Sequence, residues 1–422
     1  MQTRVEVTKH YVTKYAKAAK KVKGHILDTV VELTGWNRDH ARQQLRRRLD
    51  QPKGRATATV AVIDRRKTKA RKYSYDATKV LQHVWSISGG LSGKYLAASM
   101  ADWLDGPETH GRLVFGQGRY SRQVRAELLA MSAATIDRYL KPARDKDPLR
   151  GRAATKPGTL LRDSVAMCQA GDEVGDEPGF FDVDTVAHCG PTLVGEFARS
   201  VNFTDMRTGW TDTTAIRNNA ATYIVGACTD FVAAIPYLVT GMDFDNGSEL
   251  MNYDLLDWAA EHKVFFTRDR PYQENDQATV ESKNNHAVRK YGFYYRYDTA
   301  EELGLLQHLW PLVNDRRNFF TPAKKPTGWS TDAVGRRKRL YDHPITPYQR
   351  LLDSGILSPA QQQELTQYKA SLDPAAIAID IDHIQHQLVK LATAKTRNLQ
   401  RELDTANTPP DPAGIKIHRQ AS

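Results

Sequence analysis

Residues 242–250, MDFDNGSEL, combine three local signals within nine residues. The first part is apolar and strand-like, and it carries Asp243 and Asp245 two positions apart. Asn246-Gly247 follows as a turn signal, and Ser248-Glu249 then opens a helical pattern. A carboxylate at the end of a buried strand costs several kcal/mol unless a cation or hydrogen-bond donors meet it. The stretch therefore predicts either a simple turn cap or one part of a metal site.

A second acidic pair favours the metal site. Asp182 and Asp184 lie in FDVDT, and alternate residues of a strand face the same side. Glu281 follows on the predicted helix NDQATVESKNN. Parallel neighbouring strands end at the same edge of a sheet, where open α/β sheets bind ligands. Converging carboxylates raise one another's pKa, and two Mg²⁺ ions, with Mn²⁺ as a substitute, would relieve that repulsion. Such a pair of ions serves phosphodiester chemistry.

The surrounding pattern predicts a mixed α/β sheet. Three strand-like segments, GFFDVDTVAHCG, EFARSVNFTDMRTGW and TDTTAIR, suggest a meander. Helical and strand-like segments then alternate up to residue 318, which predicts helices on both faces of the sheet.

The N-terminal part reads as two helix-turn-helix candidates. The first breaks at Thr34-Gly35-Trp36, with Asn37 as the cap of a basic second helix. The second candidate breaks before Ser132, which is a predicted cap. A solvated basic face on a small helical bundle is the alternative explanation for the first candidate. If they bind DNA, the predicted contacts come from Arg38, Arg42, Arg46 and Arg138.

The C-terminal part predicts a small basic β module and two helices. Ile377, Ile381, Ile384, Leu388 and Leu391 are spaced by four and three residues. This heptad-like spacing fits an intramolecular helix pair as well as a self-association helix. The predicted segments, in order, are: helix-turn-helix 1–60, basic linker 61–73, second helix-turn-helix 74–145, linker 146–178, catalytic core 179–320, β module 321–357, helices 358–403 and disordered tail 404–422.

Composition limits the class of protein. The chain has 422 residues, 40% of them hydrophobic, and a formal net charge of +11, which favours nucleic acid as a partner. Its cysteines, Cys168, Cys189 and Cys228, show neither a disulfide framework nor a paired zinc motif. Neither a signal peptide nor a membrane-spanning run is evident. A reducing, bacterial cytoplasmic location near the nucleoid is expected, with no role for a membrane.

From residue 179 to residue 345, the chain resembles the retroviral-integrase-like catalytic core of bacterial insertion-sequence transposases. The resemblance is carried by PGFFDVDTVAHCG, MDFDNGSEL and RPYQENDQATVESKNN, with 35 residues between Asp245 and Glu281. It implies a multidomain protein with an RNase H-like core, preceded by all-α helix-turn-helix modules and followed by the β module and C-terminal helices. The zinc-binding His/Cys module of retroviral integrases is absent from the sequence.

The resemblance also implies residue roles. It assigns the catalytic and metal-binding acids to Asp184, Asp245 and Glu281. Asp182, Asp243 and Asn246 would then support those ligands without binding the ions themselves. His188 and Asn285 could contact DNA, although His188 could equally pack in the core and Asn285 could be an ordinary exposed residue.

The resulting functional hypothesis is a DNA transposase. It would bind terminal inverted repeats, cleave at the element ends with Mg²⁺, and join the 3′-hydroxyls to target DNA as a dimer or larger homo-oligomer. The alternatives are a structure-selective nuclease on the same fold and a DNA-binding regulator derived from a transposase. Strand transfer would distinguish a transposase from the nuclease, which only cuts. Metal-dependent cleavage would distinguish an active enzyme from the DNA-binding regulator.

Overall fold

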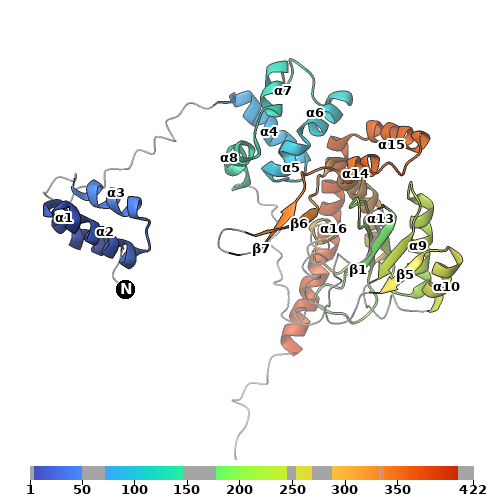
Figure 1. Ribbon diagram of the computed structural model, residues 1–422. Coiled ribbons are helices and arrows are strands. Elements are labelled where there is room, and N and C mark those ends of the chain that lie inside the picture. The colour runs from blue at the N-terminus through green and yellow to red at the C-terminus, as the bar shows by residue number, and fades with distance from the viewer. Residues whose placement is uncertain are drawn as a thin grey trace, which may run out of the picture. The chain divides into compact units, whose positions relative to one another are not determined.

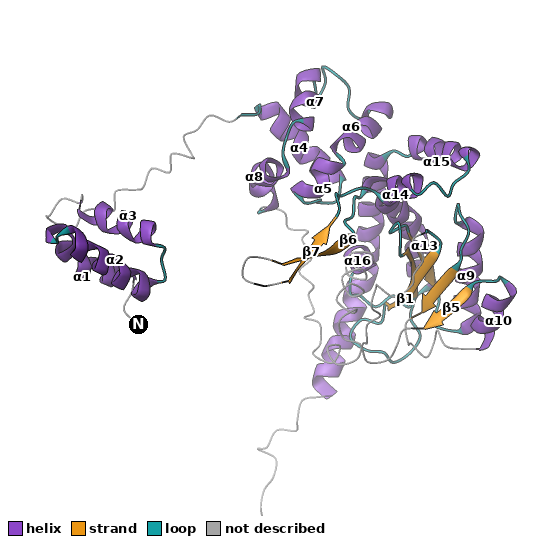
Figure 2. Cartoon of the chain, in the orientation of Figure 1, coloured by secondary structure: helices purple, strands orange, loops and turns teal. Residues whose placement is uncertain are grey.

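The computed structural model describes residues 4–49, 72–145, 177–244, 253–268, 288–331, 335 and 337–406. These residues fall into two compact units, Met1–Arg71 and Lys72–Ser422, and each unit is described by itself (Figure 1). In the first unit, the described residues 4–49 form helices as their only regular secondary structure. The second contains a central five-stranded mixed sheet, a two-stranded sheet and helices, including a long C-terminal one (Figure 2). The predicted fold class is confirmed.

The first unit is a three-helix domain with a small core of its own. Helix α1 spans Arg4–Lys17, α2 spans Lys20–Thr34 and α3 spans Arg38–Leu49. The predicted break is present, because Gly35 has a left-handed φ of 68° and its N–H donates to Val31. The Asn37 side chain accepts a hydrogen bond from the His40 N–H at 2.8 Å, as a cap does. The core comprises Val7, Tyr15, Leu27, Val30, Ala41 and Leu45.

The second helical block opens the larger unit. Its helices are α4 (Tyr75–Ile87), α5 (Gly93–Ala98), α6 (Met100–Thr109), α7 (Arg122–Leu129) and α8 (Ala133–Arg144). The predicted break lies between α7 and α8. Ser132 occupies the N-cap position, but its hydroxyl contacts the Thr135 hydroxyl at 3.0 Å and caps no backbone N–H.

This block shares one hydrophobic core with the sheet region. The Trp103 indole donates to the Phe320 carbonyl at 3.1 Å, and Lys369 pairs with Asp102 at 2.7 Å. The buried Arg316 guanidinium donates to the Ile87 carbonyl. Segment 74–145 was predicted as a DNA-binding module separated by a linker, yet it packs as part of the larger unit. Most of that linker lies outside the described residues.

The central sheet follows the predicted meander and alternation. Its strands are β1 (Phe180–Ala187), β2 (Arg199–Asp205), β3 (Thr211–Ile216), β4 (Gly241–Phe244) and β5 (Phe265–Arg268). Their order is β3-β2-β1-β4-β5. The first three are antiparallel neighbours, and β4 and β5 run parallel to β1. This order places β1 and β4 at the centre, as the RNase H-like core predicted for residues 179–320 requires.

One face of the sheet is packed by α9 (Ala221–Ala234), with α10 (Tyr253–Glu261) beside that helix. The Phe231 ring of α9 lies 4.8 Å from the Phe181 ring and stacks at 4.2 Å on Phe203. Phe181 and Phe203 belong to the face that alternates with Asp182 and Asp184. The acids therefore lie on the face away from α9.

The free edge of β3 is covered by side chains of α13 (Ala300–Asp315) and the following π-helical turn η3 (Arg316–Phe320). The Asn314 amide accepts from the Thr213 N–H at 3.0 Å and donates to the Thr213 carbonyl at 3.1 Å. In the same way, the Asn318 amide accepts from the Thr211 N–H at 2.9 Å and donates to the Thr211 carbonyl at 2.8 Å. The two amides therefore satisfy the edge groups that a further strand would otherwise bind.

Replacing Asn314 or Asn318 by Ala should destabilise the protein by about 1–3 kcal/mol each, because a buried N–H and a buried carbonyl lose their partners. Chemical denaturation followed by circular dichroism would measure the change. His308→Ala, at an exposed position of the same helix, is the matched control. Equal effects of Asn314→Ala and His308→Ala would show that the amides do not stabilise this edge.

The C-terminal elements begin with the hairpin β6 (Pro326–Thr331) and β7 (Arg337–Tyr341), which confirms the predicted β module. Helices α14 (Pro347–Asp353), α15 (Pro359–Ser371) and α16 (Pro374–Ala406) follow. The helix α16 extends to Ala406, so residues 404–406, predicted as part of the tail, are helical.

The heptad-like residues of α16 pack inside the chain. Ile377, Ile381 and Leu388 are buried in the same core as the sheet, and Ile384 packs against it. Helices α13 and α16 are direct neighbours. Polar contacts fasten α16 to the short helix α12 (Lys290–Gly292) and the loop after it, such as Gln385 with the Tyr291 carbonyl at 2.9 Å. Of the two alternatives for this spacing, the structure shows the intramolecular one.

Candidate active site

The acids of β1 and β4 lie side by side in the centre of the sheet. The parallel register pairs Asp182 with Asp243, so these two carboxylates leave neighbouring strands on the same face. Asp184 lies two residues further along β1 on that face. Asp184 and Asp243 are only 7% and 8% exposed, whereas Asp182 is half-buried. Three carboxylates thus share one face of two adjacent strands, with two of them largely shielded from solvent.

A row of polar side chains continues from Asp184 across β2 and β3. Asn202 is the direct partner of Asp184 in the antiparallel register. The Asn202 carbonyl oxygen accepts from the Thr213 hydroxyl at 2.8 Å, and its amide donates to the Thr204 hydroxyl at 3.1 Å. These bonds fix the orientation of the Asn202 side chain beside Asp184. Sequence reasoning missed these three residues, although polar residues at every second position of SVNFTD and TDTTAI were a usable signal.

The other predicted acids of this centre, Asp245 and Glu281, lie outside the described residues, as do Asn246 and Asn285. Within the described part of the chain, no group of three or more His, Cys, Asp or Glu side chains has the arrangement of a metal site. Of the predicted acids of this centre, the described residues include Asp182, Asp184 and Asp243, which share one face of β1 and β4.

His188 is fully buried just beyond the end of β1. Its Nε2 lies 2.8 Å from the Ser200 hydroxyl. Burial, helped by the positive charge of Arg289, holds the pKa of His188 well below its usual value, so the ring is neutral. This environment matches the core-packing alternative for His188, and a DNA contact of His188 stays a prediction.

The four arginines predicted to contact DNA differ in their surroundings. Arg38 forms an ion pair with Asp28, and Arg42 pairs with Asp39 at 3.0 Å. Arg46 is exposed on α3. Arg138 is exposed on α8, where its guanidinium lies 3.3 Å from the Thr135 hydroxyl. Their roles in DNA binding stay predictions.

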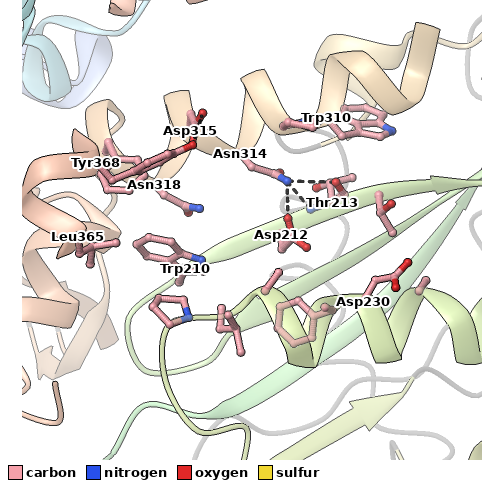
Figure 3. Close-up of a pocket in the computed structure, with 18 of the residues that line it drawn as sticks. Trp210, Asp212, Thr213, Asp230, Trp310, Asn314, Asp315, Asn318, Leu365 and Tyr368 are labelled. Atoms are coloured by element: carbon pink, nitrogen blue, oxygen red, sulfur yellow. Dashed lines mark hydrogen bonds between the residues drawn. The ribbon is translucent and has the colours of Figure 1, made fainter. Parts of the chain in front are cut away.

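A separate cavity of about 760 Å³ lies along β3, at the edge of the sheet opposite β5 (Figure 3). It is enclosed by residues of β3, α9, α13 and α15, and its lining does not include Asp184 or Asp243. Its carboxylates include Asp212 and Asp315. Burial, reinforced by the charge of Asp315, raises the pKa of Asp212 to about 7. Burial likewise raises the pKa of Asp315 to about 6.

The raised pKa of Asp212 predicts a pH-dependent stability. The native carboxyl holds its proton up to about pH 7, whereas its ordinary pKa is 3.8. Between these values the unfolded chain binds fewer protons than the native one, so stability falls as pH rises. Asp212→Asn removes this loss and should raise the melting temperature more at pH 8 than at pH 5. The exposed Asp254→Asn is the control, and an equal shift at both pH values would contradict the assignment.

The comparisons with known proteins give a relative of similar length. The chain is 31% identical over 350 residues to an uncharacterized protein, y4rM, of Sinorhizobium fredii. The match covers 83% of this chain and 95% of that protein. No family model matches the sequence.

Among solved structures, the catalytic core domain of BIV integrase matches with 15% identity and a TM-score of 0.28. That match covers 45% of this chain and 98% of the integrase chain. The identity and the TM-score of this match are both low. The fold described above therefore rests on the order and directions of the strands in this chain. In the described helices, no stretch is both long and apolar enough to span a lipid bilayer.

Proposed function

The chain belongs to the same family as the uncharacterized protein y4rM of Sinorhizobium fredii. We propose that it is a DNA transposase. The observation that carries the proposal is the register of β1 and β4. It pairs Val183 with Phe244, and Asp184 and Asp245 are the next residues in the sequence. The two acids assigned from the resemblance thus follow directly on paired residues of adjacent parallel strands.

The chemistry of the donor set fits hard divalent cations. The predicted ligands, Asp184, Asp245 and Glu281, offer only carboxylate oxygens, which Mg²⁺ and Mn²⁺ prefer over nitrogen or sulfur ligands. Asp184 would hold the ions together with Asp245 and Glu281. Two Mg²⁺ ions, when bound, would supply positive charge for the attacking and leaving oxygens of a phosphodiester displacement.

The chain's own residues would orient and shield this centre. Burial of Asp184 limits its rotamers and its access to bulk water, while Asn202 keeps a fixed polar contact surface beside it. The half-buried Asp182 lies two residues before Asp184 on β1, about 6.5–7 Å along the strand, and the buried Asp243 is the partner of Asp182 in the register with β4. That separation favours a supporting role, in which they hold a ligand or an ordered water in place.

The substrates follow from the same proposal. The enzyme would cleave at the terminal inverted repeats of an insertion sequence, release 3′-hydroxyl ends and join them to target DNA. Two ends must reach one target, so a dimer or larger homo-oligomer is expected. The first unit supports repeat binding by its fold, since a turn at Gly35 joins α2 to the basic helix α3. Such a protein would work in the bacterial cytoplasm, at the nucleoid.

The decisive experiment is cleavage of a labelled duplex that carries the element's own end. Cleavage and joining should require Mg²⁺ or Mn²⁺ and should stop in EDTA, because the proposed ligands are all oxygens. Products joined to a second duplex would favour transposase over nuclease, and cleavage without joining would favour the nuclease. The absence of any metal-dependent cleavage would leave the DNA-binding regulator as the better interpretation. Robust cleavage in EDTA would contradict the proposed metal centre.

A further inference from the structure

The hairpin formed by β6 and β7, here called the ribbon, carries exposed aromatic side chains. Trp329 is 57% exposed and Tyr341 is 51% exposed. Within the described part of the chain, neither strand contributes a residue to the hydrophobic cores. A two-stranded hairpin is at best marginally stable alone in water, and an exposed Trp adds unfavourable apolar surface. Aromatic residues in such a position are typical of binding surfaces.

Cationic side chains surround these rings. The Arg339 guanidinium lies 5.7 Å from the centre of the Trp329 ring, and these two residues are direct partners in the hairpin register. The Arg337 guanidinium lies 5.3 Å from the same ring. Lys324 lies 5.9 Å from the Tyr341 ring. Residues 324–341 contain a single acidic residue, Asp332, and six basic residues: Lys324, Lys325, Arg336, Arg337, Lys338 and Arg339.

The positive surface continues onto the helical block. Lys94 at the start of α5 lies close enough to Lys324 to lower the pKa of the Lys324 ammonium. Two like charges in contact repel each other, and a polyanion that bridges them would remove this repulsion. The ribbon and α5 thus share one basic surface.

The base of the ribbon is held firmly. The Asp342 carboxylate accepts from the Lys325 N–H at 2.7 Å and pairs with Arg350 of α14 at 2.5 Å. Arg350 also donates to the Ala323 carbonyl at 2.9 Å. Ala323 and Ile345 exchange two backbone hydrogen bonds just below the hairpin. These contacts fix the direction in which the ribbon leaves the larger unit.

We propose that the ribbon binds duplex DNA, with Arg337, Arg339 and Lys324 on phosphates and Trp329 against sugar or base edges. The major groove of DNA admits a two-stranded ribbon, and arginine and lysine are the usual phosphate partners. The positive charge beside the exposed rings of Trp329 and Tyr341 complements a polyanion, which favours DNA over a protein as the partner. The inference rests on the proposed function only in taking DNA as the polyanion that the enzyme meets.

The test measures binding of the full-length protein to a labelled duplex of about 30 base pairs in EDTA, over a range of NaCl concentrations. Arg337→Ala/Arg339→Ala should weaken binding and lower the slope of log K against log salt by about 1.8, or 0.9 per phosphate contact. Trp329→Ala should weaken binding about fivefold with little change in slope, and Trp329→Phe should recover most of the loss. Arg397→Ala/Arg401→Ala, at exposed positions of α16, removes the same charge as a matched control.

The outcomes separate this inference from the proposed function. Equal slopes for the ribbon and control double variants would overturn the inference, as would losses confined to a single-stranded probe of the same length. Circular dichroism of each variant would verify that the fold is retained. Because binding is measured in EDTA, a ribbon effect in a protein that never cleaves DNA would support the ribbon and contradict the transposase. If the protein cleaves DNA but the ribbon variants bind DNA like the control variant, the transposase proposal would be supported and the ribbon inference contradicted.

Discussion

Asp184→Asn is expected to reduce end cleavage and strand transfer by at least about a hundredfold while DNA binding is retained. The substitution keeps the size of the side chain but removes a charge next to the proposed reaction centre. Losing one group that stabilises a transition state commonly costs 10²–10³ in rate. Asp184 is buried on the central strand and is fixed between β2 and β4, so no neighbouring side chain can move into its place without distorting the sheet. Cleavage of a labelled repeat end, with binding measured in parallel, provides the test.

Variants of the other predicted acids are matched to this one. Asp245→Asn and Glu281→Gln should be as inactive as Asp184→Asn. Asp182→Asn and Asp243→Asn should slow cleavage by about 10–100-fold yet leave it measurable, as expected for residues that support a metal ligand. If the Asp184→Asn variant cleaved DNA at the wild-type rate, Asp184 would not be a catalytic residue. An Asp243→Asn variant that folds and is as inactive as Asp245→Asn would show that the wrong aspartate of MDFDNGSEL was assigned.

The isolated first unit, residues 1–71, is expected to bind the terminal repeats without metal and with a steep dependence on salt. A protein that makes about 6–10 phosphate contacts loses roughly 10³–10⁵ in affinity between 50 and 200 mM salt. The unit has its own core around Val30, Ala41 and Leu45, so it should fold alone. A fragment that continued through α8 would expose the surface on which Trp103 meets Phe320, and it would be prone to aggregate.

Single substitutions test the same assignment. Arg46→Ala should lower the slope of log K for repeat binding against log salt by about 0.9 if this exposed side chain contacts a phosphate. Lys20→Ala, at an exposed position at the start of α2, is the control and should leave the slope unchanged. Repeat binding by residues 72–422 that equals that of the whole chain would contradict the role assigned to the first unit.

Local patterns predicted several features of both units correctly. The period-two alternation of FDVDT placed Asp182 and Asp184 on one face, and the strands of the meander form as expected. Asn37 caps its helix because the interaction spans only three residues. Each of these features depends on neighbours in sequence, where backbone geometry fixes what can meet.

Features that depend on distant partners could not be predicted. The spacing of Ile377, Ile381 and Leu388 allowed two interpretations, and only the position of α13 showed that these side chains pack within the chain. His188 follows an acidic strand and resembled a functional residue, but it lies in the core beside Ser200. Segment 74–145, assigned as a separate module, packs into the larger unit through contacts such as that between Trp103 and Phe320, which are 217 positions apart and which no local pattern predicts.

The sequence by itself therefore determined which residues are strand-forming, which face of β1 carries acids, and where helices begin and end, because these are consequences of side-chain period and capping. Only the tertiary structure decided that Asp182 lies opposite Asp243, that Asn314 and Asn318 cover the edge of β3, and that the β6–β7 ribbon stays uncovered. Strand register and burial are set by the fit of whole faces against one another. No local pattern records which distant face will provide that fit.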